Sequence, residues 1–263
     1  MSTQDRKAKA QAAAKNTAKG GNAIVIGGVV IILAIALVVG GVIWSATKDS
    51  GGAGDALPKG VAAGAPLEPY ADANPAKDAP VVDVYEDFRC PACKLFETYE
   101  GETFTQLAQD GKIRLRVHLK TVIDSLTGGD SSAVAGSSAV CALDQGVWTE
   151  YHKALFDLQP ESETPEGFPE EAYTEAAKKA GLSGADLDEW QQCTDEGTYV
   201  NYIRSVDEAS VKDQITGTPT VIVNGTKFNW GAVIDQKTGK VDAATLTEIL
   251  TTGTVPENMV PTQ

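Results

Sequence analysis

The longest apolar run of the chain lies close to its N-terminus. Residues 23–44 carry no charged side chain, and a helix of about 20 apolar residues is long enough to cross a bilayer. Basic residues precede the run, which predicts a cytoplasmic tail over residues 1–22 and an extracytoplasmic body. We therefore expect a single-pass anchor in the cell membrane. The alternative is a cleaved signal peptide, whose apolar core is usually only ~7–15 residues long. Both readings place the body where disulfides persist.

The segment that follows the apolar run shows no apolar periodicity. Residues 45–79 are rich in Gly, Ala, Pro and Asp, a composition typical of flexible linkers. The sequence therefore predicts a tether that leads to a folded domain over residues 80–255.

Within that domain, the spacing of apolar residues predicts alternating strands and helices. The β-branched run 81–85 indicates a buried strand, and the alternation over 112–119 indicates a second one. Between them, Pro91 suits the first turn of a helix. Residues from about 124 to 212 follow helical patterns, with Asp130 as a candidate N-cap.

Strand patterns return in the C-terminal part of the domain. Asn224-Gly225 separates two short strand-like runs, which predicts a hairpin. Residues 243–250 then predict a closing helix. The order of strand, helix, strand, helical block, hairpin and helix predicts an α/β fold with a helical insertion at about 124–212.

Charge and cysteine content narrow the classes of function. The formal net charge is −14, and an acidic body argues against nucleic-acid binding, which needs a basic surface. The chain has four cysteines, an even number that allows two disulfides. They are Cys90, Cys93, Cys141 and Cys193.

The spacing of the cysteines does not favour a metal. A structural zinc site needs ligands in local clusters, whereas Cys141 and Cys193 stand apart. His118 and His152 are equally isolated, and we expect them to be ordinary strand and helix residues. The sequence predicts neither a metal nor a cofactor.

The two cysteine pairs differ in what a bridge would contribute. A bridge from Cys90 to Cys93 closes a very short loop and so stabilises little. A bridge from Cys141 to Cys193 closes a long loop and is worth up to ~4 kcal/mol. We therefore expect the second pair to be a structural disulfide, with an electron-relay pair as the alternative.

The Cys90-Pro91-Ala92-Cys93 motif has physical reasons to be reactive. Cys90 lies where a strand turns into a helix, so its sulfur faces the positive end of the helix dipole, which favours the thiolate. Cys93, one turn later, would be the resolving thiol. Thr218-Pro219 precedes a strand, and X-Pro bonds are the usual place for a cis peptide.

These residues together resemble the DsbA family of thiol-disulfide oxidoreductases, which have a thioredoxin-like fold. The similarity covers about residues 79 to 253, and the anchor and the second cysteine pair resemble membrane-tethered DsbA-like proteins of mycobacteria and related actinobacteria. The resemblance implies that Cys90 is the nucleophile, that Cys93 resolves the mixed disulfide, and that Pro219 is a cis-proline beside them. It also implies that reduced, unfolded secreted proteins are the substrates. The implied reoxidising partner is a membrane protein, either DsbB-like or a vitamin K epoxide reductase homologue. We expect a monomer.

The sequence departs from the family pattern at three positions that bear on the direction of electron flow. Ala92 replaces the histidine of the best-studied DsbA motif, and Val84 stands where a buried acid is often found, with Glu86 as a substitute proton acceptor. Thr218 is a residue type also found in isomerases. The leading hypothesis is an oxidase that introduces disulfides into secreted or cell-wall proteins. The alternatives are an isomerase or reductase, including one for cytochrome c maturation, and a non-enzymatic, redox-regulated binding module.

Overall fold

The structure, a computed structural model, describes residues 54–161, 166–235 and 237–261. The predicted tail 1–22 and anchor 23–44 lie outside these residues. Within the described part of the chain, no helix has the length and apolar character needed to cross a membrane.

The described residues form a four-stranded sheet in the order β2-β1-β3-β4. The central strand β1 runs parallel to β2 and antiparallel to β3, and Val84 is paired with Val117 on one side and Val221 on the other. The strands predicted from the sequence are confirmed, and Asn224 and Gly225 adopt positive φ angles in the hairpin turn between β3 and β4. The strands are β1 (Val81–Glu86), β2 (Arg114–Leu119), β3 (Thr220–Val223) and β4 (Thr226–Phe228).

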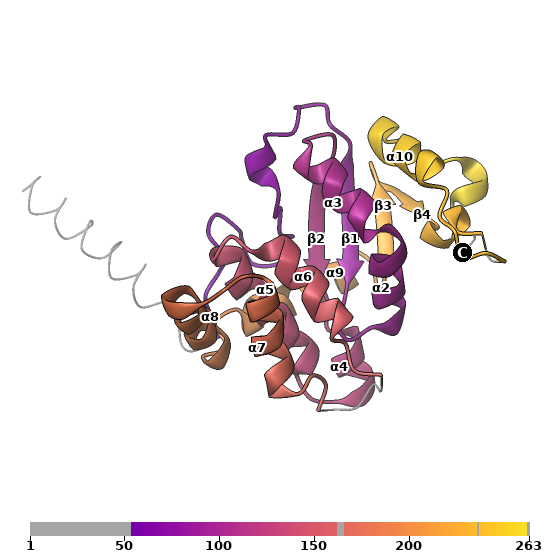
Figure 1. The fold of residues 1–263 in the computed structure, drawn as a ribbon. Helices are drawn as coiled ribbons and strands as arrows, with labels where there is room; N and C mark the ends of the chain where they lie inside the picture. The colour runs from indigo at the N-terminus through magenta and orange to yellow at the C-terminus, as the bar shows by residue number, and fades with distance from the viewer. Residues whose placement is uncertain (1–53, 162–165, 236, 262–263) are drawn as a thin grey trace, which may run out of the picture. The chain divides into compact units, whose positions relative to one another are not determined.

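One long helical segment follows β1 directly and carries the CxxC motif at its start. It consists of α2 (Pro91–Phe96), a π-helical stretch η2 (Glu97–Gly101) and α3 (Glu102–Gln109). The C-terminal helix α10 (Ala243–Thr252) packs beside α3 (Figure 1). Phe96 packs against Phe104 and Trp230, so apolar contacts hold the start of this segment to the domain.

Between β2 and β3, six helices of the described residues form the insertion that the sequence predicts. Helix α5 lies at its centre and contacts the other five, and most of its Ala and Ser residues are buried (Figure 1). Small side chains allow helices to approach closely. The six are α4 (Val122–Thr127), α5 (Ser131–Asp144), α6 (Trp148–Asp157), α7 (Glu170–Lys179), α8 (Gly184–Asp195) and α9 (Val200–Lys212).

The N-cap position predicted for α5 is confirmed, but the capping contact comes from elsewhere. Asp130 occupies the position, but its side chain makes no capping hydrogen bond. Asp124, in α4, accepts hydrogen bonds from the backbone N–H groups of Ser132 and Ala133 instead, at 2.8 and 3.1 Å. A side chain from the preceding helix therefore satisfies the free N–H groups at the start of α5.

The segment predicted to be a flexible linker is packed over its described part. Leu67 is 1% exposed and forms a bridge with Val117 of β2. Further along, Ala65 O accepts a hydrogen bond from Tyr202 Oη of α9 at 2.8 Å, and a short 3-10 turn spans Ala71–Ala73. The folded domain therefore includes residues 54–79, because Leu67 pairs with strand β2 and Ala65 accepts a hydrogen bond from α9.

Candidate active site

The CxxC motif lies at the junction between strand β1 and helix α2. Cys90 is the N-cap residue of α2 with extended backbone angles, and Pro91 occupies the first helical position, where it has no N–H to leave unpaired. Cys90 is 7% exposed and Cys93 is fully buried, and both are free thiols. The structure thus describes the dithiol form, with only the first sulfur reachable from solvent.

The two thiols have opposite acidities. A hydrogen bond from the Cys93 thiol, the Thr218 side chain, and the N–H groups of Cys93 and Ala92 lower the pKa of Cys90 to about 6, although partial burial opposes them. Burial raises the pKa of Cys93 well above its ordinary value, and the neighbouring Cys90 adds to the effect. At neutral pH, Cys90 is therefore the thiolate and Cys93 remains protonated.

The Thr218-Pro219 segment faces Cys90. The peptide bond between the two residues is cis, and the Cys90 thiol lies 3.5 Å from the carbonyl oxygen of Thr218, to which it can donate. The Thr218 hydroxyl is buried and has no hydrogen-bond partner among the described residues, so it is available to the Cys90 sulfur. The structure therefore brings together the six residues that the sequence singles out around the motif: Cys90, Pro91, Ala92, Cys93, Thr218 and Pro219.

Glu86, the predicted proton acceptor, lies on the face of β1 that carries Val84, and both line a small internal cavity. Its carboxylate is 1% exposed and accepts a hydrogen bond from His152 Nε2 of α6 at 2.6 Å. His152 Nδ1 lies 3.8 Å from a Glu97 carboxylate oxygen. Burial would lower the pKa of His152, but Glu86 and Glu97 raise it to about 9. His152, whose side chain is 12% exposed, is therefore an imidazolium between two acids.

Gly101 leaves room for the Glu97 carboxylate in this arrangement. A Cβ atom at position 101 would collide with the Glu97 carboxylate. Burial raises the pKa of Glu97 to about 7, although the charge of His152 opposes the rise. Glu97 and His152 also line a larger cavity of about 440 Å³ between η2, α3 and α6.

The same three residues are a candidate cation site. Ligand atoms of Glu86, Glu97 and His152 all lie within 4.8 Å of one another. Two carboxylates and an imidazole suit several divalent metals, but the 2.6 Å contact between Glu86 and His152 is a complete hydrogen-bonded ion pair. His152, which appears isolated in the sequence, is thus paired with Glu86. The carboxylates of Glu86 and Glu97 balance its positive charge.

The loop that enters the motif is held by buried charges. The Asp87 carboxylate accepts from the backbone N–H groups of Arg89 and Ile123, both at 2.9 Å, and burial raises its pKa to about 7. The Arg89 guanidinium donates to the Asp124 carboxylate at 2.8 Å. These contacts tie the loop to α4 at the start of the insertion.

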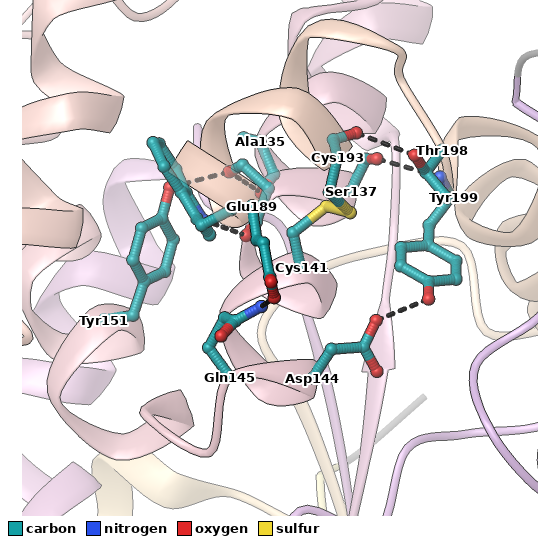
Figure 2. The surroundings of a disulfide bond; sticks show 12 residues. Ala135, Ser137, Cys141, Asp144, Gln145, Tyr151, Glu189, Cys193, Thr198 and Tyr199 are labelled. Carbon is teal, nitrogen blue, oxygen red and sulfur yellow. Dashed lines mark hydrogen bonds between the residues drawn. A yellow bond between two sulfur atoms is a disulfide. The ribbon is translucent and has the colours of Figure 1, made fainter. Parts of the chain in front are cut away.

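The second cysteine pair lies within the helical insertion. Cys141 of α5 and Cys193 of α8 form a disulfide with a Cα–Cα distance of 5.9 Å (Figure 2). Figure 2 shows Tyr199 and Asp144 on one side of the bridge, joined by a short hydrogen bond, and Tyr151 on the other. The bridge joins two helices within the insertion, as expected for a structural crosslink.

Several residues at the site carry little or no signal in the sequence. Asp87 and Arg89 are adjacent to the motif, and their charge next to a buried strand was the only available sign. His152 and Glu97 come from helical patterns in which polar residues are ordinary, and Gln159 comes from the segment just after α6. The packing of the insertion brings His152 to Glu86 and Gln159 to the backbone of the motif.

Comparisons with known proteins agree with the site. A family model described as Thioredoxin matches residues 76–243. The probable disulfide bond formation protein D of Bacillus anthracis is 24% identical over 214 residues, which are 80% of this chain and 92% of that protein.

Two solved structures from actinobacteria are also similar. The reduced disulfide bond oxidoreductase DsbG of Mycobacterium tuberculosis is 33% identical with a TM-score of 0.50, and the match covers 68% of this chain and 80% of that one. MdbA, a thiol-disulfide oxidoreductase from Actinomyces oris, is 25% identical with a TM-score of 0.53, covering 66% and 80%. The family match spans well over half of the chain and includes Cys90, Cys93 and the Thr218-Pro219 segment. The chain therefore belongs to the thioredoxin family and is a DsbA-like thiol-disulfide oxidoreductase.

Proposed function

We propose that this oxidoreductase works as an oxidase that introduces disulfides into secreted or cell-wall proteins. The observation that carries the proposal is the difference in acidity between the two thiols of the motif. A Cys90 thiolate with a pKa of about 6 is a good leaving group, and its stability favours the reduced form of the motif. A motif that prefers to be reduced takes electrons from its substrates.

The reaction proceeds in two thiol-disulfide exchanges. A substrate thiolate attacks Cys90 of the oxidised motif. A sulfur–sulfur bond forms between them, the Cys90–Cys93 bond breaks, and Cys93 receives the electron pair and a proton. A second substrate thiolate then attacks the substrate sulfur of the mixed disulfide and releases Cys90 as a thiolate. The substrate loses two electrons and the motif gains two.

Glu86 is the proposed proton acceptor and donor for the buried Cys93. Its carboxylate acts on the Cys93 thiol electrostatically and raises the pKa of Cys93 further, behind the larger effect of burial. The partner that reoxidises the motif is proposed to be a quinone-linked membrane protein, of the DsbB type or a vitamin K epoxide reductase homologue. The anchor proposed for residues 23–44 would keep the domain next to it.

The redox potential of the motif tests the proposal. A pKa of about 6 lies between the values of ~7 for thioredoxin and ~3.5 for DsbA. We expect a potential between their values of about −270 and −120 mV, measured by equilibration with glutathione. The full chain should also oxidise reduced, unfolded ribonuclease. A potential at or below that of thioredoxin would contradict the oxidase assignment.

A disulfide isomerase or reductase is the second candidate, because of the residue before Pro219. The Thr218 side chain helps to lower the pKa of Cys90, and threonine at this position also occurs in isomerases. Recovery of active ribonuclease from its scrambled form, compared with oxidation of the reduced form, separates the two. An isomerase should be faster in the first assay, and an oxidase in the second.

A further inference from the structure

A glutamine from the insertion contacts the backbone of the redox motif directly. Gln159 follows α6 by two residues and is 7% exposed. Its side-chain amide Nε2 donates to the carbonyl oxygen of Phe88 at 2.6 Å and to that of Cys90 at 3.0 Å. One side chain therefore binds the carbonyl groups of both Phe88 and Cys90, in the loop that leads into α2.

The Cys90 carbonyl is also the first acceptor of the helix. It accepts hydrogen bonds from the backbone N–H groups of Cys93 at 3.0 Å and Lys94 at 3.2 Å. Its orientation therefore determines the first turn of α2, in which the N–H groups of Ala92 and Cys93 face the Cys90 sulfur.

The contact is reciprocal. The Lys94 ammonium group, on the residue after Cys93, lies 3.3 Å from the carbonyl oxygen of Asp157 and 3.4 Å from that of Gln159. These carbonyls belong to the C-terminal end of α6 and the residues after it, where backbone acceptors lack helical partners and a cation is favourable. The motif and the insertion thus hold each other through Gln159 in one direction and Lys94 in the other.

We propose that Gln159 is a positioning residue of the redox site: by fixing the Phe88 and Cys90 carbonyls, it keeps the N–H groups of Ala92 and Cys93 directed at the Cys90 sulfur. Its importance follows from Ala92, which brings no side-chain donor to the motif. Backbone N–H groups, the Cys93 thiol and Thr218 must supply the stabilisation. Backbone donors act only when the peptide groups are held in place.

The proposal deepens the thiol-disulfide activity and rests on the proposed function for its meaning in the cell, although its test does not depend on substrate. Gln159→Leu removes the amide donors at similar size, and Gln159→Glu keeps the shape but presents carboxylate oxygens to the two carbonyls. In the reduced full chain, thiolate absorbance at 240 nm against pH measures the Cys90 midpoint. We expect both variants to raise the midpoint by about one unit, which lowers the thiolate fraction at acidic pH by a factor of ~10. Equilibration with glutathione should shift by a similar factor toward the oxidised motif.

Gln191→Leu is the matched control. Gln191 is also a glutamine of the insertion, and its side chain contacts Asp195 and Thr174. This substitution should leave the Cys90 midpoint unchanged. Gln159→Asn keeps the amide but shortens its reach, so it gives the same readout if the leucine variant does not fold.

The outcomes distinguish the two proposals. Folded Gln159 variants whose midpoint and glutathione equilibrium stay within a factor of ~2 of wild type would show that Gln159 only fills space, whatever the potential of the wild-type motif. A thioredoxin-like potential for the wild-type chain would overturn the oxidase assignment, while a shift caused by Gln159→Leu would still support the positioning role.

Discussion

The two cysteine pairs of this protein illustrate how position in the fold determines what a pair of thiols can do. Cys90 and Cys93 are separated by two residues at the start of a helix and stand as thiols of unequal acidity. Cys141 and Cys193 are 52 residues apart and join two helices as a disulfide. The first pair constrains almost nothing when it closes, whereas the second closes a long loop.

The surroundings of the pairs differ as much as their spacing. Backbone N–H groups and Thr218 surround Cys90 and stabilise its anion. Cys141 is 1% exposed within the small-residue core around α5, and Cys193 packs against that core. Such surroundings favour a permanent bond, while those of Cys90 favour exchange.

The largest expected effect is loss of catalysis on removing the nucleophile. Cys90→Ser should lower oxidation of reduced ribonuclease by about 10³-fold or more, because serine does not form the mixed disulfide. Its melting temperature should stay close to that of the wild type. Cys93→Ser keeps the nucleophile and should accumulate mixed disulfides, which non-reducing electrophoresis detects. Activity retained in Cys90→Ser would mean that Cys141 and Cys193 carry electrons themselves.

Removing the second pair should affect stability rather than catalysis. The double variant Cys141→Ala with Cys193→Ala should lower the free energy of unfolding by about 2–4 kcal/mol, since the unfolded chain regains the entropy of the long loop. Urea unfolding of the full chain measures the change. The potential of the motif should remain at the wild-type value. A shifted potential would instead support the relay alternative.

The pH dependence of the potential sharpens the contrast within the first pair. Below the Cys90 pKa of about 6, reduction takes up two protons, so the potential should fall by about 60 mV per pH unit. Above it only Cys93 is protonated, and the slope should halve to about 30 mV per unit. The thiolate stabilises the reduced form fully above the ordinary thiol pKa, and this stabilisation disappears as the pH falls through about 6. A single slope from pH 4.5 to 8 would contradict the assigned acidity.

The smallest expected effect concerns the ion pairs of His152 in α6 with the carboxylates of Glu86 and Glu97. Glu86→Gln should lower the pKa of His152 from about 9 by at least about one unit, because the carboxylate lies 2.6 Å from the imidazole. Glu97→Gln should lower it less, since that contact is 3.8 Å. NMR titration of the imidazole measures both, with Glu150→Gln as the control on the same helix.

His152 also predicts a component of stability with a defined pH window. Because its pKa is raised in the folded protein, its contribution is complete below about pH 6.5 and is lost as the pH rises through about 9. Glu86→Gln should remove most of this dependence. Identical pH profiles of unfolding in the two proteins would show that the ion pair does not contribute.

Features that depend on short stretches of chain could be predicted from the sequence. The positions of β1, β2 and the hairpin follow from β-branched runs, alternation and Asn224-Gly225, and the start of α2 follows from Pro91. The spacing of the cysteines was enough to propose which pair closes a long loop. Local conformational preferences and chain entropy act over these distances, so the residues themselves contain the information.

Features that join distant segments were decided by the tertiary structure alone. Glu86 meets His152 across 66 residues, and Gln159 reaches the Cys90 carbonyl across 69. The cap of α5 comes from Asp124 rather than from the residue at the cap position. In each case a buried polar group must find a partner, and several partners satisfy the same chemistry. The packing of the insertion against the sheet selects one of them, and no local pattern records that choice.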